Sequence, residues 1–313
     1  MDKRQLVRDA IAHRPTARVP YCIRFCEEGG LATVRGLAPA GTDPYAYVDN
    51  DVELVFPPWW DWHDLGADWQ GMEAPRSPAR VRGTGSYPAF FDEVKRVHDT
   101  TGRYVLATIY GSHWEKAYFS RGIENFLADL AGEPEFARRL LTAIIDKNLV
   151  MLENFLAHSE IDGVLLGSDW GTQQDLIMST ATWEEMIRPG EQREYDLVHG
   201  YGKHVWVHSC GKIDKILPAL VEMGVDVLNP VQPECMDLAE LKARYGAKLT
   251  FWGGISTQRT LPYGTPAEVC AETRRVRDLL ARDGGYILSP SQEIQGDVPA
   301  ANLQALLATA RHG

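Results

Sequence analysis

The segment KHVWVHSCG (203–211) runs from apolar to polar residues and is followed by a helical pattern over 212–224. The same order recurs on either side of it, where short apolar runs that end in polar or glycine-rich residues alternate with amphipathic stretches. Five strand–helix units in succession indicate parallel strands covered by helices. The other four runs are GVLLGSD (163–169), VDVLNPVQ (225–232), KLTFWGGI (248–255) and GGYILSPS (284–291), with helices expected over 182–202, 237–246, 266–284 and 299–313.

Three further strands are expected in the first half of the chain, over 18–25, 52–58 and 104–111. Eight parallel strands favour closure into a TIM (β/α)8 barrel of the α/β class, although a doubly wound open sheet would give similar units. No GxGxxG or Walker loop follows any of these strands, which argues against a nucleotide-binding open sheet. We therefore predict a single barrel domain over residues 1–313, with its chemistry at the carboxyl ends of the strands.

The stretch from about 57 to 100 differs from the rest of the chain. It is rich in tryptophan, proline and glycine and shows little periodicity, so we expect an irregular insertion. Its aromatic residues, Trp59 and Trp60 among them, could line a pocket for a flat or methyl-bearing ligand. A hydrophobic plug on the rim of the barrel is an equally good interpretation.

The composition disfavours several classes of function. With a formal net charge of −11, the surface repels phosphate, so we expect no nucleic-acid partner. The amino terminus lacks the apolar core of a signal peptide, and no apolar run reaches the length of about 18 residues that a membrane span needs. An odd, sparse set of five cysteines disfavours a disulfide framework, and we expect a cytoplasmic protein.

His208 and Cys210 stand at the end of one expected strand. Residues two apart on a strand point to the same side, so one imidazole and one thiolate can converge above the barrel. Both groups are good zinc ligands. The alternative, a buried histidine beside an inert thiol, is weaker because the pair lies where barrels carry their chemistry.

A zinc site needs at least a third protein ligand, which must come from another strand end. Asp169 closes a different run, and we predict a catalytic role for it in orienting substrate or moving a proton, with a helix cap or ion pair as the alternative. The candidates for the missing metal ligand are Gln232, Glu234, Gln292 and Glu293.

Other polar or aromatic side chains near strand or helix ends are candidates for substrate binding, with a solvated or structural role as the alternative. GxSxG, HExxH and the DxDxDG calcium loop are absent from the sequence, and no lysine stands at an expected strand end to form a Schiff base. The substrate-binding candidates are Arg24, His113, Trp114, Gln173, Asn229 and Gln258.

The run through HSCG (208–211), NPVQP (229–233), GGIS (253–256) and DVP (297–299) resembles the uroporphyrinogen decarboxylase superfamily. The resemblance continues upstream in GSDWGTQQDLIMS (167–179) and covers most of residues 104–310. It implies a barrel with one of two activities. These are decarboxylation of uroporphyrinogen acetates without a cofactor, and zinc-dependent methyl transfer between a corrinoid protein and a thiol or other acceptor. It also implies a homodimer.

Two departures from the family pattern bear on this choice. Where true uroporphyrinogen decarboxylases carry an arginine-rich segment, this chain reads RFCEEGGLATVRG (24–36), and two glutamates are poorly suited to a substrate with eight carboxylates. The zinc methyltransferases add a later cysteine to the HxC pair, and this chain has Gln292 there. An amide oxygen is a weaker zinc ligand than a thiolate.

Three hypotheses follow. The first is a zinc- and corrinoid-dependent methyltransferase in which His208, Cys210 and a third ligand hold the metal, with the corrinoid carried by a partner protein. The second is a decarboxylase or lyase for a smaller acid, in which Asp169 stabilises a developing cation and His208 acts as acid and base. The third is a binding protein without catalysis, because a barrel hosts many functions.

Overall fold

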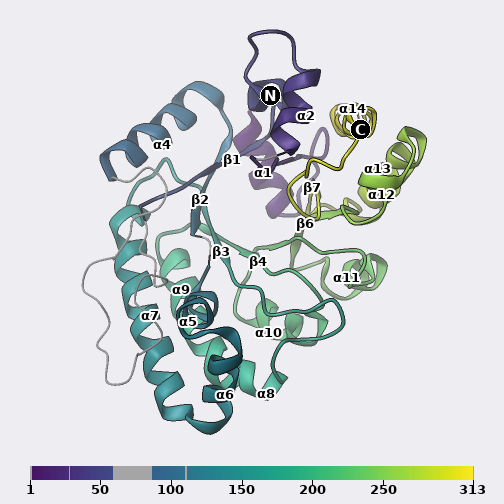
Figure 1. Cartoon of the computed structure of the whole chain (residues 1–313). Coiled ribbons are helices and arrows are strands. Elements are labelled where there is room, and N and C mark those ends of the chain that lie inside the picture. The colour runs from purple at the N-terminus through teal and green to yellow at the C-terminus, as the bar shows by residue number, and fades with distance from the viewer. Residues whose placement is uncertain (1, 28, 59–86, 110, 313) are drawn as a thin grey trace.

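The computed structural model describes residues 2–27, 29–58, 87–109 and 111–312. Its described part contains one sheet of seven parallel strands in the order β1 to β7, which curls around a central axis as a TIM-like barrel (Figure 1). The strands are β1 (Val52–Val55), β2 (Tyr104–Ile109), β3 (Gly163–Gly167), β4 (His204–His208), β5 (Val227–Asn229), β6 (Thr250–Ile255) and β7 (Tyr286–Pro290).

The predicted strand over 18–25 is instead an extended segment that closes the ring through isolated bridges. On one side, Cys22 N donates to the Leu288 carbonyl of β7 at 3.0 Å. On the other side, the side chains that precede β1 replace the strand ladder. Asn50 exchanges two hydrogen bonds with the backbone of Ile23, at 2.8 and 2.9 Å, and Asp51 accepts from Tyr21 N at 2.9 Å. The segment therefore forms isolated bridges to residues 288 and 294 and no regular eighth strand, because the Asn50 and Asp51 side chains take the place of part of a backbone ladder beside β1.

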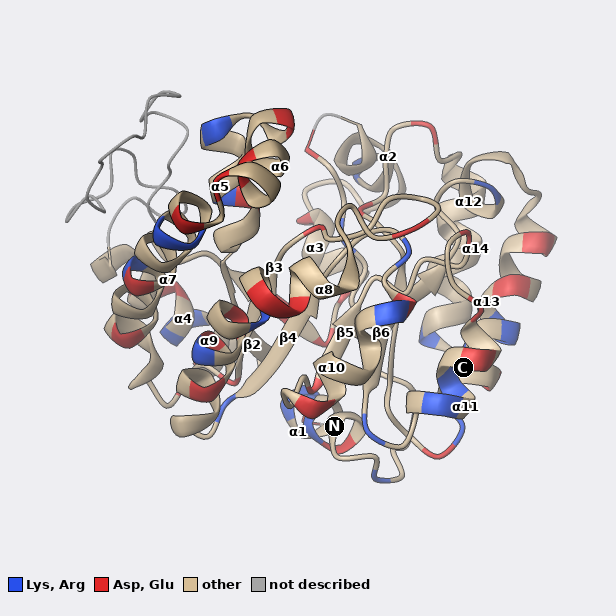
Figure 2. Ribbon diagram, turned by 90° about the horizontal axis from the view of Figure 1, so that it is seen from below, with Lys and Arg blue, Asp and Glu red and all other residues tan. Residues whose placement is uncertain are grey.

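Helices surround the strands, and the longer ones alternate with them along the chain (Figure 1). Acidic and basic residues are interspersed along these helices (Figure 2). The main helices are α1 (Lys3–Ile11), α2 (Gly30–Leu37), α3 (Pro44–Val48), α4 (Tyr87–Thr101), α5 (His113–Arg121), α6 (Ile123–Gly132), α7 (Pro134–Leu156), α9 (Arg188–Gly200), α10 (Leu217–Glu222), α11 (Leu238–Tyr245), α13 (Pro266–Leu280) and α14 (Ala300–Arg311).

Alternate strand residues fill the interior of the barrel, as the period of two requires. Trp206 of β4 packs edge-on against Trp252 of β6, with ring centroids 5.3 Å apart, and its indole N–H donates to the Tyr104 hydroxyl at 3.1 Å. Helix α1 lies across the amino-terminal ends of the strands, where Arg4 and Arg8 form ion pairs with the buried Asp162. This end is therefore packed shut, and a ligand must enter at the carboxyl ends.

The predicted irregular insertion over 57–100 is partly corrected. Residues 87–101 form helix α4, whose buried face carries Phe90, Val94 and Val97 at helical spacing. The many Trp, Pro and Gly residues that precede it in the sequence made this period hard to recognise. Residues 59–86, with Trp59 and Trp60, lie outside the described residues.

Helical structure in the middle of the chain also departs from prediction. Helices α5 to α7 were not predicted, and the helix expected over 182–202 is interrupted by a π-helical turn at Trp183–Ile187 before α9 begins. Among the described residues, no helix is long and apolar enough to cross a membrane. All five cysteines are free in the structure.

Candidate metal centre

His208 is the last residue of β4 and is held by the neighbouring strand. Its Nδ1 lies 2.5 Å from Asn229 Oδ1, and Asn229 Nδ2 donates to the Trp252 carbonyl at 2.8 Å. Because the amide nitrogen is committed to that carbonyl, the amide oxygen faces the imidazole and Nδ1 must carry the proton. This arrangement leaves Nε2 as the coordinating nitrogen, which is how metal-binding histidines are commonly prepared.

Cys210 lies two residues beyond the end of β4, and its side chain contacts the imidazole of His208. Its Sγ lies 3.3 Å from His208 Nε2. Gly211 has φ of +81°, and a side chain there would come within 2.5 Å of the Thr172 carbonyl oxygen and 2.6 Å of the Gly171 carbonyl carbon. Glycine is required on both counts, since a larger residue would push the HSC turn away from the loop after β3.

Asp169, just after β3, completes the group. Its Oδ1 accepts from Cys210 N at 2.7 Å and lies 3.6 Å from His208 Nε2. The sulfur, nitrogen and oxygen donors of Asp169, His208 and Cys210 all lie within 4.8 Å of one another. Together they form a donor set that zinc accepts, with an open position left over when three protein ligands bind.

Negative charge and burial both act on the Cys210 thiol. Burial raises its pKa, and the Asp169 carboxylate adds to the effect, so that the pKa reaches about 12. At neutral pH the thiol alone is therefore protonated and weakly nucleophilic. A bound cation would reverse this, since a metal-coordinated thiol is deprotonated.

The predicted third ligands are not all brought to this point. Gln292 is the nearest, with Nε2 3.7 Å from Cys210 Sγ. Gln232 donates instead to Gln173 Oε1 at 3.0 Å, and Glu234 accepts from the Ser256 hydroxyl. Glu293 forms an ion pair with Arg24 at 2.7 Å. Asp169, predicted as a catalytic residue, lies with His208 and Cys210 in the group of donor atoms that could hold a metal ion, and none of these four residues does.

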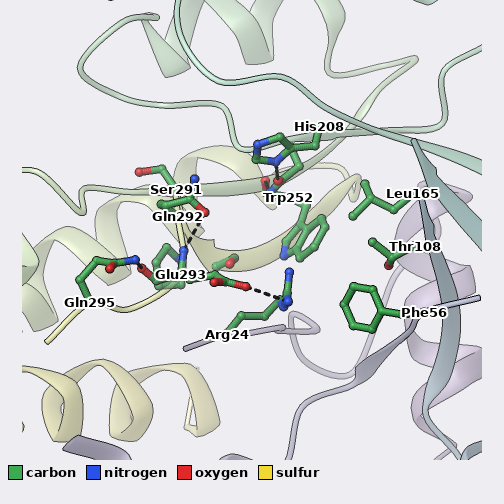
Figure 3. Close-up of a pocket in the computed structure, with 13 residues that line it drawn as sticks. Arg24, Phe56, Thr108, Leu165, His208, Trp252, Ser291, Gln292, Glu293 and Gln295 are labelled. Atoms are coloured by element: carbon green, nitrogen blue, oxygen red, sulfur yellow. Dashed lines mark hydrogen bonds and ion pairs between the residues drawn. The ribbon is translucent and has the colours of Figure 1, made fainter. Parts of the chain in front are cut away.

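A cavity of about 470 Å³ opens beside His208 at the carboxyl ends of the strands. Figure 3 shows Arg24 reaching across it towards Glu293, with Phe56, Leu165 and Trp252 forming an apolar side. The residues around it are Arg24, Phe56, Thr108, Leu165, His208, Asn229, Trp252, Ser289, Pro290, Ser291, Gln292, Glu293 and Gln295. Three of the predicted polar residues, Arg24, Asn229 and Glu293, therefore share one cavity with His208 and Gln292.

Other predicted substrate-binding residues lie elsewhere. Gln173 and Gln258 contact each other, with Gln258 Nε2 3.4 Å from Gln173 Oε1. Trp114 is fully buried, and its indole N–H donates to the Asp169 carbonyl at 3.0 Å, so it supports the loop after β3 from behind. His113 lies in a separate buried group with Glu191 and Glu194.

Glu115 is a residue of this site that the sequence did not single out. It is 2% exposed, and its Oε1 lies 3.4 Å from Asp169 N. Burial raises its pKa to about 7, with a further contribution from the Asp169 charge. A glutamate in the first turn of a helix that follows a barrel strand was the only signal available, and such glutamates commonly serve the helix dipole alone.

The fold and the site together define a class, a TIM-like barrel whose candidate metal ligands gather at the carboxyl ends of its strands. A family model described as uroporphyrinogen decarboxylase (URO-D) matches residues 65–313. The chain belongs to this family, as the motifs from HSCG to DVP had indicated.

Two relatives refine the placement within the family. The methylated-thiol–coenzyme M methyltransferase of Methanosarcina mazei is 22% identical over 231 residues, which cover 73% of this chain and 59% of that protein. A solved methyltransferase structure from Methanosarcina mazei has a TM-score of 0.75 at 15% identity, covering 99% of this chain and 98% of the other. The structural likeness shows the shared barrel, and both relatives are methyltransferases.

Proposed function

We propose that this protein is a zinc-dependent methyltransferase that moves a methyl group between a small methylated substrate or a corrinoid and a thiol or other acceptor. The observation that carries the proposal is the convergence of Asp169, His208 and Cys210, with the proton of His208 fixed on Nδ1 by Asn229. The methyltransferase relatives support the same reaction class.

Asp169, His208 and Cys210 offer zinc three suitable ligands, although Gln292 replaces the later cysteine of the zinc methyltransferases. One thiolate, one imidazole and one carboxylate are each zinc ligands, so a glutamine is not needed to complete three. When bound, zinc would lower the pKa of an acceptor thiol and favour the thiolate at neutral pH.

The side chains around the cavity would position the substrate. Phe56, Leu165 and Trp252 offer an apolar wall for a methyl-bearing group and limit water beside the ligands. Arg24 offers a cation for a carboxylate on the substrate, and Glu293 fixes its direction. A corrinoid on a partner protein would meet the substrate at this mouth of the barrel, because the opposite end is packed by α1.

A carboxy-lyase acting on a small acid is the second candidate. Its support is the Arg24 guanidinium, which lines the same cavity as His208 and could hold a carboxylate near an acid–base group. Arg24 is already paired with Glu293, so it suits an acid of low charge rather than a substrate with many carboxylates.

Replacing Cys210 separates these candidates. We expect Cys210→Ser to lower the zinc content by one ion per chain and to slow methyl transfer from methylcobalamin to a small thiol by more than about 100-fold. This follows because even changes in residues behind the ligands cost about 10–100-fold. Cys270→Ser, on the outer helix α13, is the matched control and should retain both zinc and rate.

The measurements are metal content by plasma mass spectrometry and the loss of the methylcobalamin absorption. Equal zinc and equal rate in the two variants would overturn the proposal. Release of carbon dioxide from a small acid that persists in Cys210→Ser would favour the lyase. Ligand binding without turnover in the wild type would favour a binding protein.

A further inference from the structure

A second cluster of ligand-type side chains lies between α5, α7 and α9. Glu191 and Glu194 are three residues apart on α9 and so share one face of the helix. His113 begins α5 and points at them, with Nδ1 3.2 Å from Glu191 Oε1. All three are at most 1% exposed, and their donor atoms lie within 4.8 Å of one another.

The Ser112 hydroxyl lies at the centre of this cluster. Its Oγ is 2.9 Å from Glu191 Oε1, 3.2 Å from Glu194 Oε2 and 3.2 Å from His113 Nδ1. A hydroxyl has one hydrogen to donate, so it can serve only one of the two carboxylates. If both carboxylates are ionised, the hydroxyl oxygen therefore faces one carboxylate oxygen without a hydrogen between them. A positive charge at the centre would relieve this repulsion.

The outer oxygens of the carboxylates are already held in place. The Tyr195 hydroxyl donates to Glu191 Oε2 at 2.9 Å, and Asn148 Nδ2 donates to Glu194 Oε1 at 2.8 Å. These contacts leave Oε1 of Glu191 and Oε2 of Glu194 turned inward, towards the centre. Carboxylates whose outer oxygens are fixed by hydrogen bonds and whose inner oxygens converge are the usual surroundings of a protein-bound cation.

Two buried polar atoms next to the cluster have no hydrogen-bond partner in the described part of the chain. They are His113 Nε2 and Asn148 Oδ1, in residues that are both 0% exposed. Because Nδ1 faces the carboxylates, Nε2 lies on the far side of the imidazole ring and needs a partner of its own, such as a water. The Nε2 atom borders a cavity of about 180 Å³ that is also lined by Gly190, where a side chain would come within 3.0 Å of it.

The burial of two carboxylates calls for a positive partner. Glu191 and Glu194 are at most 1% exposed, so no solvent offsets the charge of either carboxylate. The buried Lys116 amine donates to the Gly111 carbonyl. Two carboxylates in such a place are costly unless a cation or a proton joins them.

We propose that His113, Glu191 and Glu194 form a second metal site, which binds a divalent transition-metal ion independently of the site at the barrel mouth. Metal–ligand bonds of about 2.0–2.2 Å to nitrogen and oxygen suit the spacing of the three donors after small side-chain rotations. The donors contain no sulfur, so this site favours zinc, manganese or iron over softer ions.

The position of this site suggests what it does. His113 and Glu115 lie in the same first turn of α5, and Glu115 contacts the backbone of Asp169. An ion at the second site would therefore fix the start of α5 and hold Glu115 against the loop that carries Asp169. Its role is to position rather than to react with substrate.

The test uses the full chain, stripped with a chelator, dialysed against zinc chloride and analysed for metal. We expect Glu194→Gln to bind one zinc fewer per chain than the wild type, both in the native background and in Cys210→Ser. His113→Gln should behave in the same way, and circular dichroism checks that each variant is folded. Glu115→Gln, an equally buried change in α5, should leave the second site filled and is the matched control.

Cobalt substitution gives a second readout. Cobalt in the second site should show only the weak visible bands of nitrogen and oxygen ligands, and these bands should remain in Cys210→Ser and vanish in Glu194→Gln. If Glu194→Gln binds as much zinc as its parent in both backgrounds, the proposal is overturned. A proton shared by the two carboxylates would then neutralise the cluster. A loss of zinc confined to Cys210→Ser would support the barrel-mouth site alone, so the two proposals fail separately.

Discussion

The barrel-mouth cluster (Asp169, His208, Cys210) and the outer cluster (His113, Glu191, Glu194) have the same number of ligand-type groups in opposite surroundings. The first is partly exposed, includes a sulfur donor and opens to a cavity of about 470 Å³. The second is fully buried, has only nitrogen and oxygen donors and borders a cavity of about 180 Å³. The difference in exposure suits the first cluster to contact with a substrate and the second to a buried structural role.

Burial accounts for the contrast in charge. At the barrel mouth, solvent reaches Asp169, which is about one-third exposed, while the Cys210 thiol keeps its proton. In the outer cluster no solvent stabilises the two glutamates, and the pKa of Glu194 rises. Glu115 stands between the two clusters and shares the behaviour of the buried one.

Removing the imidazole from the outer cluster should have the largest effect on stability. His113→Leu leaves Glu191 and Glu194 facing each other in a buried place, and breaking a buried pair typically costs about 3–5 kcal/mol. His98→Leu is the matched control, because His98 pairs with Asp99 on the surface, where such pairs contribute about 0–1 kcal/mol. Urea unfolding at neutral pH measures both. A loss no larger than that of the control would show that the two environments do not differ.

The next effect concerns Glu115 and pH. Its pKa is about 7 in the folded chain against an ordinary value of 4.5, so its contribution to stability is complete below 4.5 and is lost as the pH rises to 7. In metal-free protein, Glu115→Gln should therefore gain stability relative to the wild type across this range. The gain is at most about 3 kcal/mol, from 1.36 kcal/mol per pKa unit. Unfolding curves from pH 4 to 8 test this, and parallel curves for the two proteins would contradict it.

The smallest expected effect concerns the support of His208. Asn229→Ala removes the acceptor for His208 Nδ1 and should weaken zinc binding at the barrel mouth by about 10–100-fold. Asn229→Asp keeps an acceptor oxygen and should restore most of the affinity. Competition with a chromophoric zinc chelator measures the change. If the Asn229→Ala and Asn229→Asp variants bind zinc equally well, the hydrogen bond to Nδ1 does not orient the imidazole for zinc binding.

Much of the fold could be predicted because its signals are local. Strand and helix periods placed β3 to β7 and their helices, and the polar strand ends marked the face of the barrel where the candidate metal ligands lie. The strand predicted over 18–25 is not regular, because the side chains of Asn50 and Asp51 replace part of its backbone ladder. Such a substitution leaves no periodic signal in the sequence. Helix α4 was missed because only three buried apolar residues mark its helical period, and a stretch rich in Trp, Pro and Gly precedes it in the sequence.

The sequence by itself determined the barrel, the family and the placement of His208 and Cys210 at a strand end, because polar residues directly follow the apolar run of the strand. Only the tertiary structure decided their third partner. Asp169 and Cys210 are 41 residues apart, and they meet because the register sets Gly167 of β3 beside His208 of β4. The outer cluster is less local still, since it joins the start of α5 to one face of α9 across the packing of α7. Contacts of this kind follow from sheet register and helix packing, which the order of residues along the chain does not display.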